Sequence, residues 1–550
     1  MPTVSAHVAL TLARHIDHVF GVMGNGNAYF LDALERATDV HFTAVRHEAG
    51  GVVAADAFHR ASGQLAAATS TYGAGFTNTL TALAEAVQAH VPLILVVGDE
   101  PTSGPRPWDV DQIAMASAVG ARTYTVGRTD AAATTVIAIE HALTYRVPTV
   151  LAIPYDVASL DAGDVPAAPD PVLPAPLIAR GPFAEASLRE VASALATASR
   201  PFLLAGRGAW IAGAGDALGD VADLTGAVTA STALARGIFP RGEYDLGVTG
   251  GFGAEGAMDL VREADVAVVF GASLNQFTMR FGDLFAPGTR VFQIDVAPTA
   301  THPHVAGFVR ADAATAAAEI VTELSEMGAE PSGWRESIDI AALRQYPAGD
   351  ALAADGRLDP RSVAARIGEL LPADRVVVSD GGHFIGWANM YWPVASPDRM
   401  MMVGTAFQSI GLGWPSVAGA ALAQPDATVV LTTGDGGGLM ALSDLETAVR
   451  TAAGRGLAVV WNDAAYGAEV NLYGLKGLAK APMMIPQVDF AALATGVGAE
   501  GVVVRDLSDL DRLESWAAED AASRSFLVLD CRISGDVIAP YQQEIIRVNS

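Results

Sequence analysis

The chain has very few cysteines and few positive charges. Cys531 is the only cysteine among 550 residues, which excludes an internal disulfide and a metal site built from several cysteines. Lysine and arginine total 34 against 61 aspartates and glutamates, so the formal net charge is −27. A surface this acidic argues against nucleic acid or an anionic membrane as a partner, because both bind basic surfaces. Apolar runs such as residues 91–97 are much shorter than the ~18 residues that a membrane-spanning helix needs.

The amino-terminal sequence lacks the basic start and long apolar core of a secretory signal. Together with the single cysteine, this predicts a cytoplasmic protein. Hydrophobic residues make up 51% of the chain and charged residues 17%, a composition that fills large cores and excludes a disordered or fibrous protein. At ~150 residues per domain, this length predicts three or four domains.

The alternation of apolar runs and helical patterns predicts an α/β protein of three doubly wound parallel-sheet domains. We place the first domain at residues 1–165, a central Rossmann-like domain at 178–330 and the third domain at 355–545. A stretch rich in Pro, Ala and Asp at 161–176 is the expected linker. The strands expected from short apolar runs are 64–69, 92–97, 148–153, 266–270, 290–294, 375–378, 428–431 and 457–461.

The most informative pattern lies in the third domain. The expected strand 428–431 runs into Gly434-Asp435-Gly436-Gly437, and a helix is expected to follow this run and to continue through residues 446–448. Glycines let backbone N–H groups approach a phosphate, and an aspartate can bind the hard cation that accompanies a diphosphate. The next expected strand ends at Asn462-Asp463, which places a second oxygen ligand 28 positions after Asp435. Gly-Asp-Gly alone is usually a turn, but this pair of motifs predicts a metal and diphosphate site.

The two motifs resemble the signature of thiamine-diphosphate (ThDP) enzymes, in which Gly-Asp-Gly is followed one strand later by Asn-Asn. The resemblance assigns Asp435, the side chain of Asp463 and the backbone carbonyl of Ala465 to a Mg²⁺ that holds the diphosphate. Most members carry Asn where this chain has Asp463, so the oxygen ligand is kept and a negative charge is added. The residues that the resemblance assigns to cofactor binding here are Gly434, Gly436, Gly437 and Tyr466.

A second match lies in the first domain. Arg46-His47-Glu48 precedes a helical run at 50–61 that ends at Gly63, and the stretch resembles that of acetolactate synthase relatives. In that family the glutamate, here Glu48, hydrogen-bonds the aminopyrimidine ring of ThDP and takes part in activating the cofactor. The alternative is an exposed glutamate at a helix start, which favours the helix dipole. The downstream motif favours the catalytic interpretation.

Further matches extend the resemblance over nearly the whole chain. The turn 71–78 is closest in form to benzaldehyde-lyase-like members. The stretch 408–415 implies that Ile410 is the apolar wedge that bends the cofactor, with the backbone of Gln408 and Ile410 on its aminopyrimidine. Gly382 and His383 lie where relatives contact the diphosphate, and His383 replaces a glutamine of acetolactate synthases.

The resemblance also implies an oligomer. In family members the first domain of one subunit faces the third domain of another, so Glu48 and Asp435 of one active site come from different chains. We therefore expect a homodimer or homotetramer with active sites at the subunit interface.

Two positions depart from acetolactate synthases and bear on specificity. Asn25 follows the expected first strand and can hydrogen-bond a carbonyl or alcohol without titrating; alternatively it only tolerates a left-handed turn. Glu469 lies six positions past Asp463, where pyruvate decarboxylases carry a glutamate that handles protons and acetolactate synthases an apolar residue. A carboxyl there favours protonation and release of an aldehyde; alternatively it lies on a helix surface.

The resemblance thus implies ThDP- and Mg²⁺-dependent cleavage and formation of C–C bonds on small 2-oxo acids or hydroxyketones, as in an acetolactate-synthase-like carboligase. A 2-oxoacid decarboxylase, a 2-hydroxyketone lyase and a non-catalytic ThDP-fold binding protein remain alternatives, and FAD is an open but less favoured cofactor. Residues 251–256 fit the Gly-x-Gly-x-x-Gly pattern of dinucleotide sites but follow no clear apolar strand. We expect a turn there rather than a nicotinamide-binding site.

Overall fold

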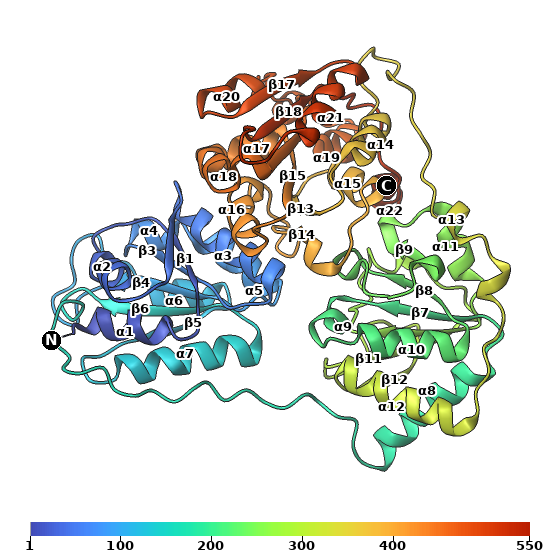
Figure 1. Ribbon diagram of the computed structural model, residues 1–550, viewed down its shortest axis with the longest axis horizontal. Coiled ribbons are helices and arrows are strands. Elements are labelled where there is room, and N and C mark those ends of the chain that lie inside the picture. Colours follow the sequence, from blue (N-terminus) through green and yellow to red (C-terminus); the bar gives the residue numbers. More distant parts are fainter. Residues whose placement is uncertain (1, 550) are drawn as a thin grey trace.

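Three six-stranded, all-parallel sheets form the protein, whose computed structural model describes residues 2–549. Helices alternate with the strands and cover the sheets, which confirms the predicted three doubly wound α/β domains. Figure 1 shows the first domain in blue, the central domain in green to yellow and the third in orange to red. An extended segment without helix or strand, residues 163–180, runs from the first domain to the central one.

The first sheet has the strand order β2-β1-β3-β4-β6-β5. Three of its strands match the predicted apolar runs, whereas β2 and β5 were missed because they are half-exposed edge strands without an apolar run. The strands are β1 (His18–Gly21), β2 (His41–Ala44), β3 (Ala67–Ser70), β4 (Ile94–Asp99), β5 (Arg122–Thr125) and β6 (Thr149–Pro154). The helices are α1 (Val4–Leu12), α2 (Ala28–Ala37), α3 (Glu48–Ser62), α4 (Ala74–Thr77), α5 (Leu80–Gln88), α6 (Gln112–Ala118) and α7 (Ala131–Tyr145).

The third sheet repeats this topology with the order β14-β13-β15-β16-β18-β17. Its strands are β13 (Arg375–Ser379), β14 (Met400–Met402), β15 (Thr428–Gly434), β16 (Gly456–Trp461), β17 (Glu500–Val504) and β18 (Leu527–Cys531). Its helices are α14 (Pro360–Leu370), α15 (Ile385–Tyr391), α16 (Gly413–Ala423), α17 (Asp435–Met440), α18 (Leu445–Ala452), α19 (Gly467–Glu469), α20 (Phe490–Gly496), α21 (Asp511–Ala518) and α22 (Pro540–Asn549).

The central sheet has the order β12-β11-β10-β7-β8-β9, which is the Rossmann arrangement. Its strands are β7 (Pro201–Ala205), β8 (Val228–Ser231), β9 (Asp245–Val248), β10 (Val266–Phe270), β11 (Arg290–Asp295) and β12 (Val305–Arg310). Its helices are α8 (Pro182–Thr197), α9 (Arg207–Ile211), α10 (Gly215–Thr225), α11 (Glu255–Arg262), α12 (Ala313–Met327) and α13 (Ile340–Leu343).

The glycine-rich run at 251–256 corrects one detail of the sequence analysis. It does follow a strand, the short edge strand β9, whose four residues gave no apolar signal. A Cβ atom on Gly251 would lie 2.4 Å from the ring of Phe277, and one on Gly253 would lie 2.4 Å from the sulfur of Met258. The chain's own side chains therefore fill the space at this turn.

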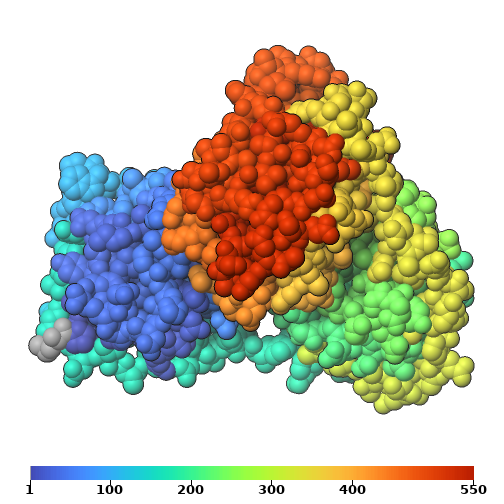
Figure 2. Space-filling model, turned by 45° about the horizontal axis from the view of Figure 1, so that its top comes forward, coloured from blue at the N-terminus to red at the C-terminus, as the bar shows by residue number. Residues whose placement is uncertain are grey.

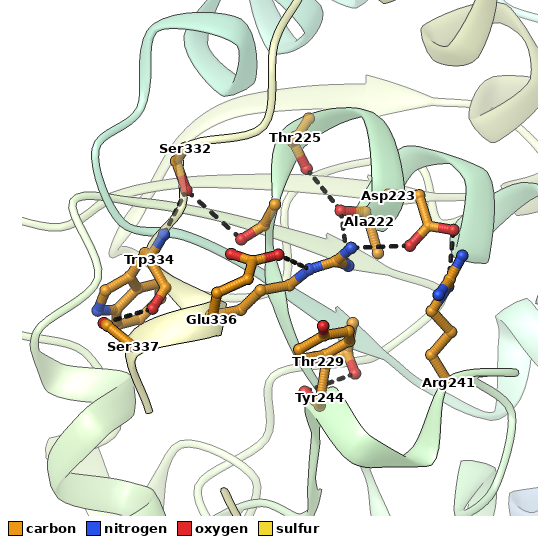
Figure 3. A network of polar contacts seen from close by, with 12 residues as sticks. Ala222, Asp223, Thr225, Thr229, Arg241, Tyr244, Ser332, Trp334, Glu336 and Ser337 are labelled. Carbon is orange, nitrogen blue, oxygen red and sulfur yellow. Dashed lines mark hydrogen bonds and ion pairs between the residues drawn. The ribbon is translucent and has the colours of Figure 1, made fainter. Parts of the chain in front are cut away.

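A polar network joins the carboxyl-terminal part of α10 to the segment 332–337 of the same domain (Figure 3). Arg335 donates to the carbonyl of Ala222 at 3.1 Å and pairs with Asp223 at 3.0 Å and with Glu336 at 3.1 Å. Its guanidinium carbon also lies 4.1 Å from the ring centre of Tyr244. The network anchors the segment that leaves the central domain toward the third.

The first and third domains share one hydrophobic core. Helix α3 packs against α16 so closely that a Cβ atom on Gly419 would lie 2.0 Å from the carbonyl oxygen of Ala54. Side chains of both domains, including Phe58 and Trp414, contribute to a single buried cluster. Figure 2 shows the third domain seated against both of its neighbours. Within residues 2–549, no helix is long and apolar enough to cross a bilayer.

Candidate active site

Two buried carboxylates lie together at the carboxyl edge of the third sheet. Strands β15 and β16 are neighbours, and Gly434 pairs with Trp461 at their ends. Asp435 follows the first strand directly and Asp463 follows the second by two residues, with exposed fractions of 3% and 5%. The predicted juxtaposition arises because carboxyl ends of adjacent parallel strands meet at one edge of the sheet.

Asp435 has an oxygen that no group of the described chain satisfies. Its Oδ1 accepts a hydrogen bond from the backbone N–H of Gly436 at 2.9 Å, whereas Oδ2 is buried without a hydrogen-bond partner. Burial, together with the negative charge of Asp463, raises the pKa of Asp435 to about 7. A buried carboxylate in this position is costly unless a cation compensates it.

Asp463 is held by its own turn and by a histidine. Its Oδ1 accepts from the backbone N–H of Ala465 at 3.2 Å, and its Oδ2 lies 2.9 Å from Nε2 of His383. Ala464, between Asp463 and Ala465 in the chain, has φ of +64°, an uncommon value for a residue with a side chain. Arg357 donates to the backbone carbonyls of Asn462 and Asp463 at 3.0 and 3.1 Å, which fixes this turn from outside.

These groups fit a hard cation. Mg²⁺ prefers oxygen ligands and is held by one or two carboxylates together with phosphate oxygens and water. The two aspartates and the carbonyl of Ala465 offer such a set, and the unpartnered Oδ2 of Asp435 supplies a free oxygen. Over residues 2–549 no group of three or more His, Cys, Asp and Glu side chains is arranged to hold a metal ion. The set would thus need a ligand's oxygens to complete it.

His383 lies beside the acidic pair, after β13. Gly382 before it has φ of +142°, and the hydroxyl of Tyr541 donates to the His383 carbonyl. Burial lowers the pKa of His383, but the carboxylates of Asp463, Asp435 and Glu469 more than offset this and leave that pKa above its usual value. His383 and Gly382 were predicted from the family resemblance, whereas the ion pair of His383 with Asp463 was not predicted.

The glycines of the motif are required by tight packing of the site. A Cβ atom on Gly434 would lie 2.9 Å from Phe384, one on Gly436 would lie 2.7 Å from the ring of Tyr466, and one on Gly437 would lie 2.7 Å from Oδ2 of Asp380. The run is also helical, since Asp435 to Gly438 begin α17, where the sequence predicted a helix that follows the glycine-rich turn. The observed helix is interrupted, because α17 ends at Met440 and α18 begins at Leu445.

The turn at 403–412 carries the two remaining third-domain candidates. Gln408 is exposed with φ of +59°, and Ile410 is half-buried. Asp380 fixes the end of this turn, because its Oδ1 accepts from the backbone N–H groups of Gly411 at 3.0 Å and Leu412 at 3.2 Å. We did not predict a role for Asp380; the signal was a carboxylate directly after the apolar run 375–379.

Glu48 is the first residue of α3, at the amino end of the first-domain helix that packs on the third domain. It is half-buried, and its Oε2 accepts a hydrogen bond from Nδ2 of Asn78 at 2.9 Å. In the part of the chain that the structure describes, no hydrogen bond or ion pair joins Glu48 to the third-domain site. Within one chain, therefore, Glu48 and the acidic pair are not connected by direct contacts.

The two specificity candidates are both exposed. Asn25 donates from Nδ2 to the hydroxyl of Tyr72 at 2.9 Å, and the guanidinium of Arg106 lies 4.0 Å above the Tyr72 ring. Glu469 ends α19 where the chain continues into a π-helical turn, Val470–Gly474. Such turns are often found at functional sites.

The chain matches one protein family over all three domains. Three domain models of one family match the chain: the N-terminal TPP binding domain of thiamine pyrophosphate enzymes over residues 2–115, their central domain over 188–323 and their C-terminal TPP binding domain over 380–531. The chain is similar to the acetolactate synthase large subunit of Parasynechococcus marenigrum, with 28% identity covering 93% of this chain and 85% of that protein. It is also similar to sulfoacetaldehyde acetyltransferase of Roseovarius nubinhibens, with 26% identity covering 100% and 94%.

A solved structure shares the fold. The thiamine diphosphate-dependent 4-hydroxybenzoylformate decarboxylase of Rhodococcus jostii superposes with a TM-score of 0.78 and 20% identity, covering 97% of this chain and 99% of that one.

Proposed function

Because the chain belongs to the thiamine-diphosphate-dependent enzymes, we propose that it anchors this cofactor through Mg²⁺ and breaks and forms C–C bonds on 2-oxo acids, as an acetolactate-synthase-like carboligase. The observation that carries the proposal is the buried acidic pair, in which Oδ2 of Asp435 has no hydrogen-bond partner. Bound at this edge, the cofactor supplies an electron sink for cleavage of the bond next to a carbonyl.

The third domain provides the anchoring groups of this proposal. Asp435, Asp463 and the carbonyl of Ala465 would hold the metal ion, which would neutralise the carboxylate that burial otherwise disfavours. The groups proposed to face the diphosphate are Gly382, His383, Gly434, Gly436, Gly437 and Tyr466. The turn carrying Gln408 and Ile410 would support the aminopyrimidine.

The first domain provides the proton-handling group. The Glu48 carboxylate is half-buried and held by Asn78, so it can share a proton with a ring nitrogen while its position stays fixed. Since Glu48 and the acidic pair are not in direct contact within one chain, we propose a homodimer or homotetramer in which they come from different subunits. Asn25, on the same edge of the first sheet, would hydrogen-bond the substrate.

A 2-oxoacid decarboxylase or 2-hydroxyketone lyase is the second candidate, and the place of Glu469 favours it. This carboxylate is exposed, it contributes to raising the pKa of His383, and it directly precedes the π-helical turn. From there it can deliver a proton to a bound intermediate. A second cofactor such as FAD is less favoured, because the turn at 251–256 is filled by Phe277 and Met258. A cytoplasmic location remains a prediction.

Product analysis by NMR tests the proposal. Purified protein with ThDP and Mg²⁺ is given pyruvate, beside Glu48→Gln and the exposed, charge-matched control Glu35→Gln. Acetolactate from the parent and the control, but not from Glu48→Gln, is the expected result. Acetaldehyde or acetoin instead would establish the second candidate and make Glu469 the next residue to change. Absence of ThDP binding to the parent would refute both.

A further inference from the structure

A buried ion network lies at the contact between the first and third domains. Asp56 and Glu85, on α3 and α5, are exposed by 1% and 0%. Arg60 connects them: its Nε lies 2.5 Å from Oδ1 of Asp56, and its Nη2 lies 3.1 Å from Oε1 of Glu85. Buried charges of this kind persist only when every partner is satisfied.

The network reaches into the third domain at two points. Oε2 of Glu85 accepts a hydrogen bond from the backbone N–H of Phe407 at 2.7 Å, and Arg60 donates from Nη1 to the carbonyl of Met402 at 3.0 Å. Residues 402 and 407 bracket the first half of the turn that presents Gln408 and Ile410. The first domain therefore holds the first half of this turn through backbone groups at both of its ends.

The turn needs such support because of its conformation. Gln408 has φ of +59°, where a residue with a side chain is strained, and Phe407 is 48% exposed. Inside the turn, the N–H of Ser409 donates to the carbonyl of Gly404 at 2.8 Å, and Nε2 of Gln408 donates to the carbonyl of Thr405 at 3.0 Å. Asp380 fixes the far end, so the near end depends on Glu85 and Arg60.

We propose that Glu85, with Arg60 as its counter-ion, is a positioning residue for the cofactor-binding turn. Its carboxylate fixes the backbone at Phe407 and thereby holds the strained conformation of Gln408. The proposal rests on the proposed function, in which the backbone of Gln408 and Ile410 supports the aminopyrimidine. Glu85 itself touches neither cofactor nor substrate in this account; it acts through the backbone of the turn.

The chemistry of the network predicts which substitution is informative. Glutamine has the shape of glutamate but one acceptor oxygen and one N–H₂ group, whereas Glu85 accepts from two donors at once. Glu85→Gln can therefore keep only one of the bonds to Arg60 and Phe407. Glu85→Asp keeps the charge that pairs with Arg60, but its shorter side chain cannot make both contacts in their present geometry.

The test measures ThDP binding rather than turnover alone. ThDP is titrated with Mg²⁺ into the parent, Glu85→Gln, Glu85→Asp and Arg335→Gln, following tryptophan fluorescence or heat. Arg335→Gln is the control, because it breaks the ion pairs of a buried arginine in the central domain, far in sequence from the turn (Figure 3). Amide hydrogen exchange of residues 403–410 is followed in the same proteins.

We expect both Glu85 variants to raise the Kd for ThDP by roughly tenfold or more, the effect of losing one charge-assisted hydrogen bond. Exchange at residues 403–410 should accelerate, and kcat at saturating ThDP should change far less than the KM for ThDP. Arg335→Gln should lower the Tm and leave both the Kd and the exchange at the turn as in the parent.

The outcomes separate this inference from the function on which it rests. If the parent binds no ThDP, the proposed function fails and the positioning role fails with it. If the parent binds and both Glu85 variants bind equally well, the positioning role is overturned and the function stands. A Kd for Arg335→Gln that rises as much as for the Glu85 variants would show a general loss of stability and would also overturn the inference. Because Glu85→Asp keeps the buried charge pair, its Kd for ThDP can be measured even if Glu85→Gln does not fold.

Discussion

The first and third domains have the same sheet topology but differ in the titratable groups that burial perturbs most. Numbered within each domain, both sheets have the strand order 2-1-3-4-6-5. Burial lowers the pKa of several first-domain histidines, among them His15, His18, His59 and His141. Burial raises the pKa of third-domain carboxyls, which are Asp380, Asp435, Asp444 and Asp530, and of Asp99 in the first domain. One scaffold therefore carries two chemistries, set by the residues that follow and support its strands.

Each of these domains also holds a functional turn of the other. Glu85 of the first domain accepts from the backbone N–H of Phe407 at 2.7 Å, and Asp444 of the third accepts from that of Arg46 at 2.8 Å. Both carboxylates are buried, and their targets lie one residue before Gln408 and two before Glu48. The first domain therefore supports the turn proposed to bind the cofactor, and the third domain supports the helix start that carries the proposed proton-handling Glu48.

The sharpest way to test this division is to remove Asp435. Asp435→Asn should lower kcat/KM by roughly a thousandfold or more, since even groups that only support a metal ligand cost roughly 10- to 100-fold when lost. ThDP binding in the presence of Mg²⁺ should be lost as well, measured by calorimetry. Asp426→Asn, which removes an exposed carboxylate from the same domain, is the control. Retained ThDP affinity in Asp435→Asn would show that the acidic pair is not the anchor.

Glu48→Gln should instead separate turnover from binding. Loss of a proton-handling carboxylate lowers kcat by roughly 10²- to 10⁴-fold. ThDP affinity should stay within about tenfold of the parent, because the third domain provides the anchor. Steady-state kinetics and a ThDP titration on the same preparation measure both quantities. A variant that loses affinity as completely as Asp435→Asn would remove the proposed distinction between the two domains.

The juxtaposition of Asp435 and Asp463 was predictable because local pattern and sheet topology determine it. The sequence predicts that Asp435 and Asp463 lie close together, because each follows an apolar run and adjacent parallel strands end at one edge of the sheet. The buried strand β10 was predicted with its observed bounds, whereas the buried strand β18 was missed. The half-exposed edge strands β2 and β5 left no apolar run.

The supporting carboxylates could not be found in this way. Glu85 and Asp444 receive their hydrogen bonds from residues 322 and 398 positions away, so nothing in their own neighbourhood distinguishes them from surface acids. In the proposed oligomer, the meeting of Glu48 and the acidic pair depends on how the chains assemble, which local sequence patterns do not reveal. The supporting roles of Glu85 and Asp444 become visible only in the folded structure.

Acid should affect the two domains in opposite directions. Burial lowers the pKa of His59 to about 4 from 6.5, so between these values the unfolded chain binds more protons than the folded one. The free energy of unfolding should then fall as the pH drops from about 6.5 to 4, by up to about 3 kcal/mol from this group. A carboxyl with a raised pKa, such as Asp380, has the opposite effect and favours the folded state as the pH falls.

Hydrogen exchange from pH 7 to pH 4, corrected for intrinsic rates, measures this difference. First-domain amides should lose protection relative to those of the third domain, and His59→Asn should reduce the change. Protection that declines in parallel in both domains, or a decline that His59→Asn leaves intact, would contradict the electrostatic contrast.

Asp463→Asn should give the smallest effect. Asparagine keeps an oxygen for the metal ion, and family resemblance implies that residue here. The substitution removes the ion pair with His383 at 2.9 Å and weakens the attraction for a cation. It also removes a charge that opposes ionisation of Asp435, so the two changes partly cancel. The Mg²⁺ concentration for half-maximal activity should shift by no more than about tenfold. A loss as severe as that of Asp435→Asn would mean that the added charge is essential, and that the third domain binds its cation through two equivalent carboxylates.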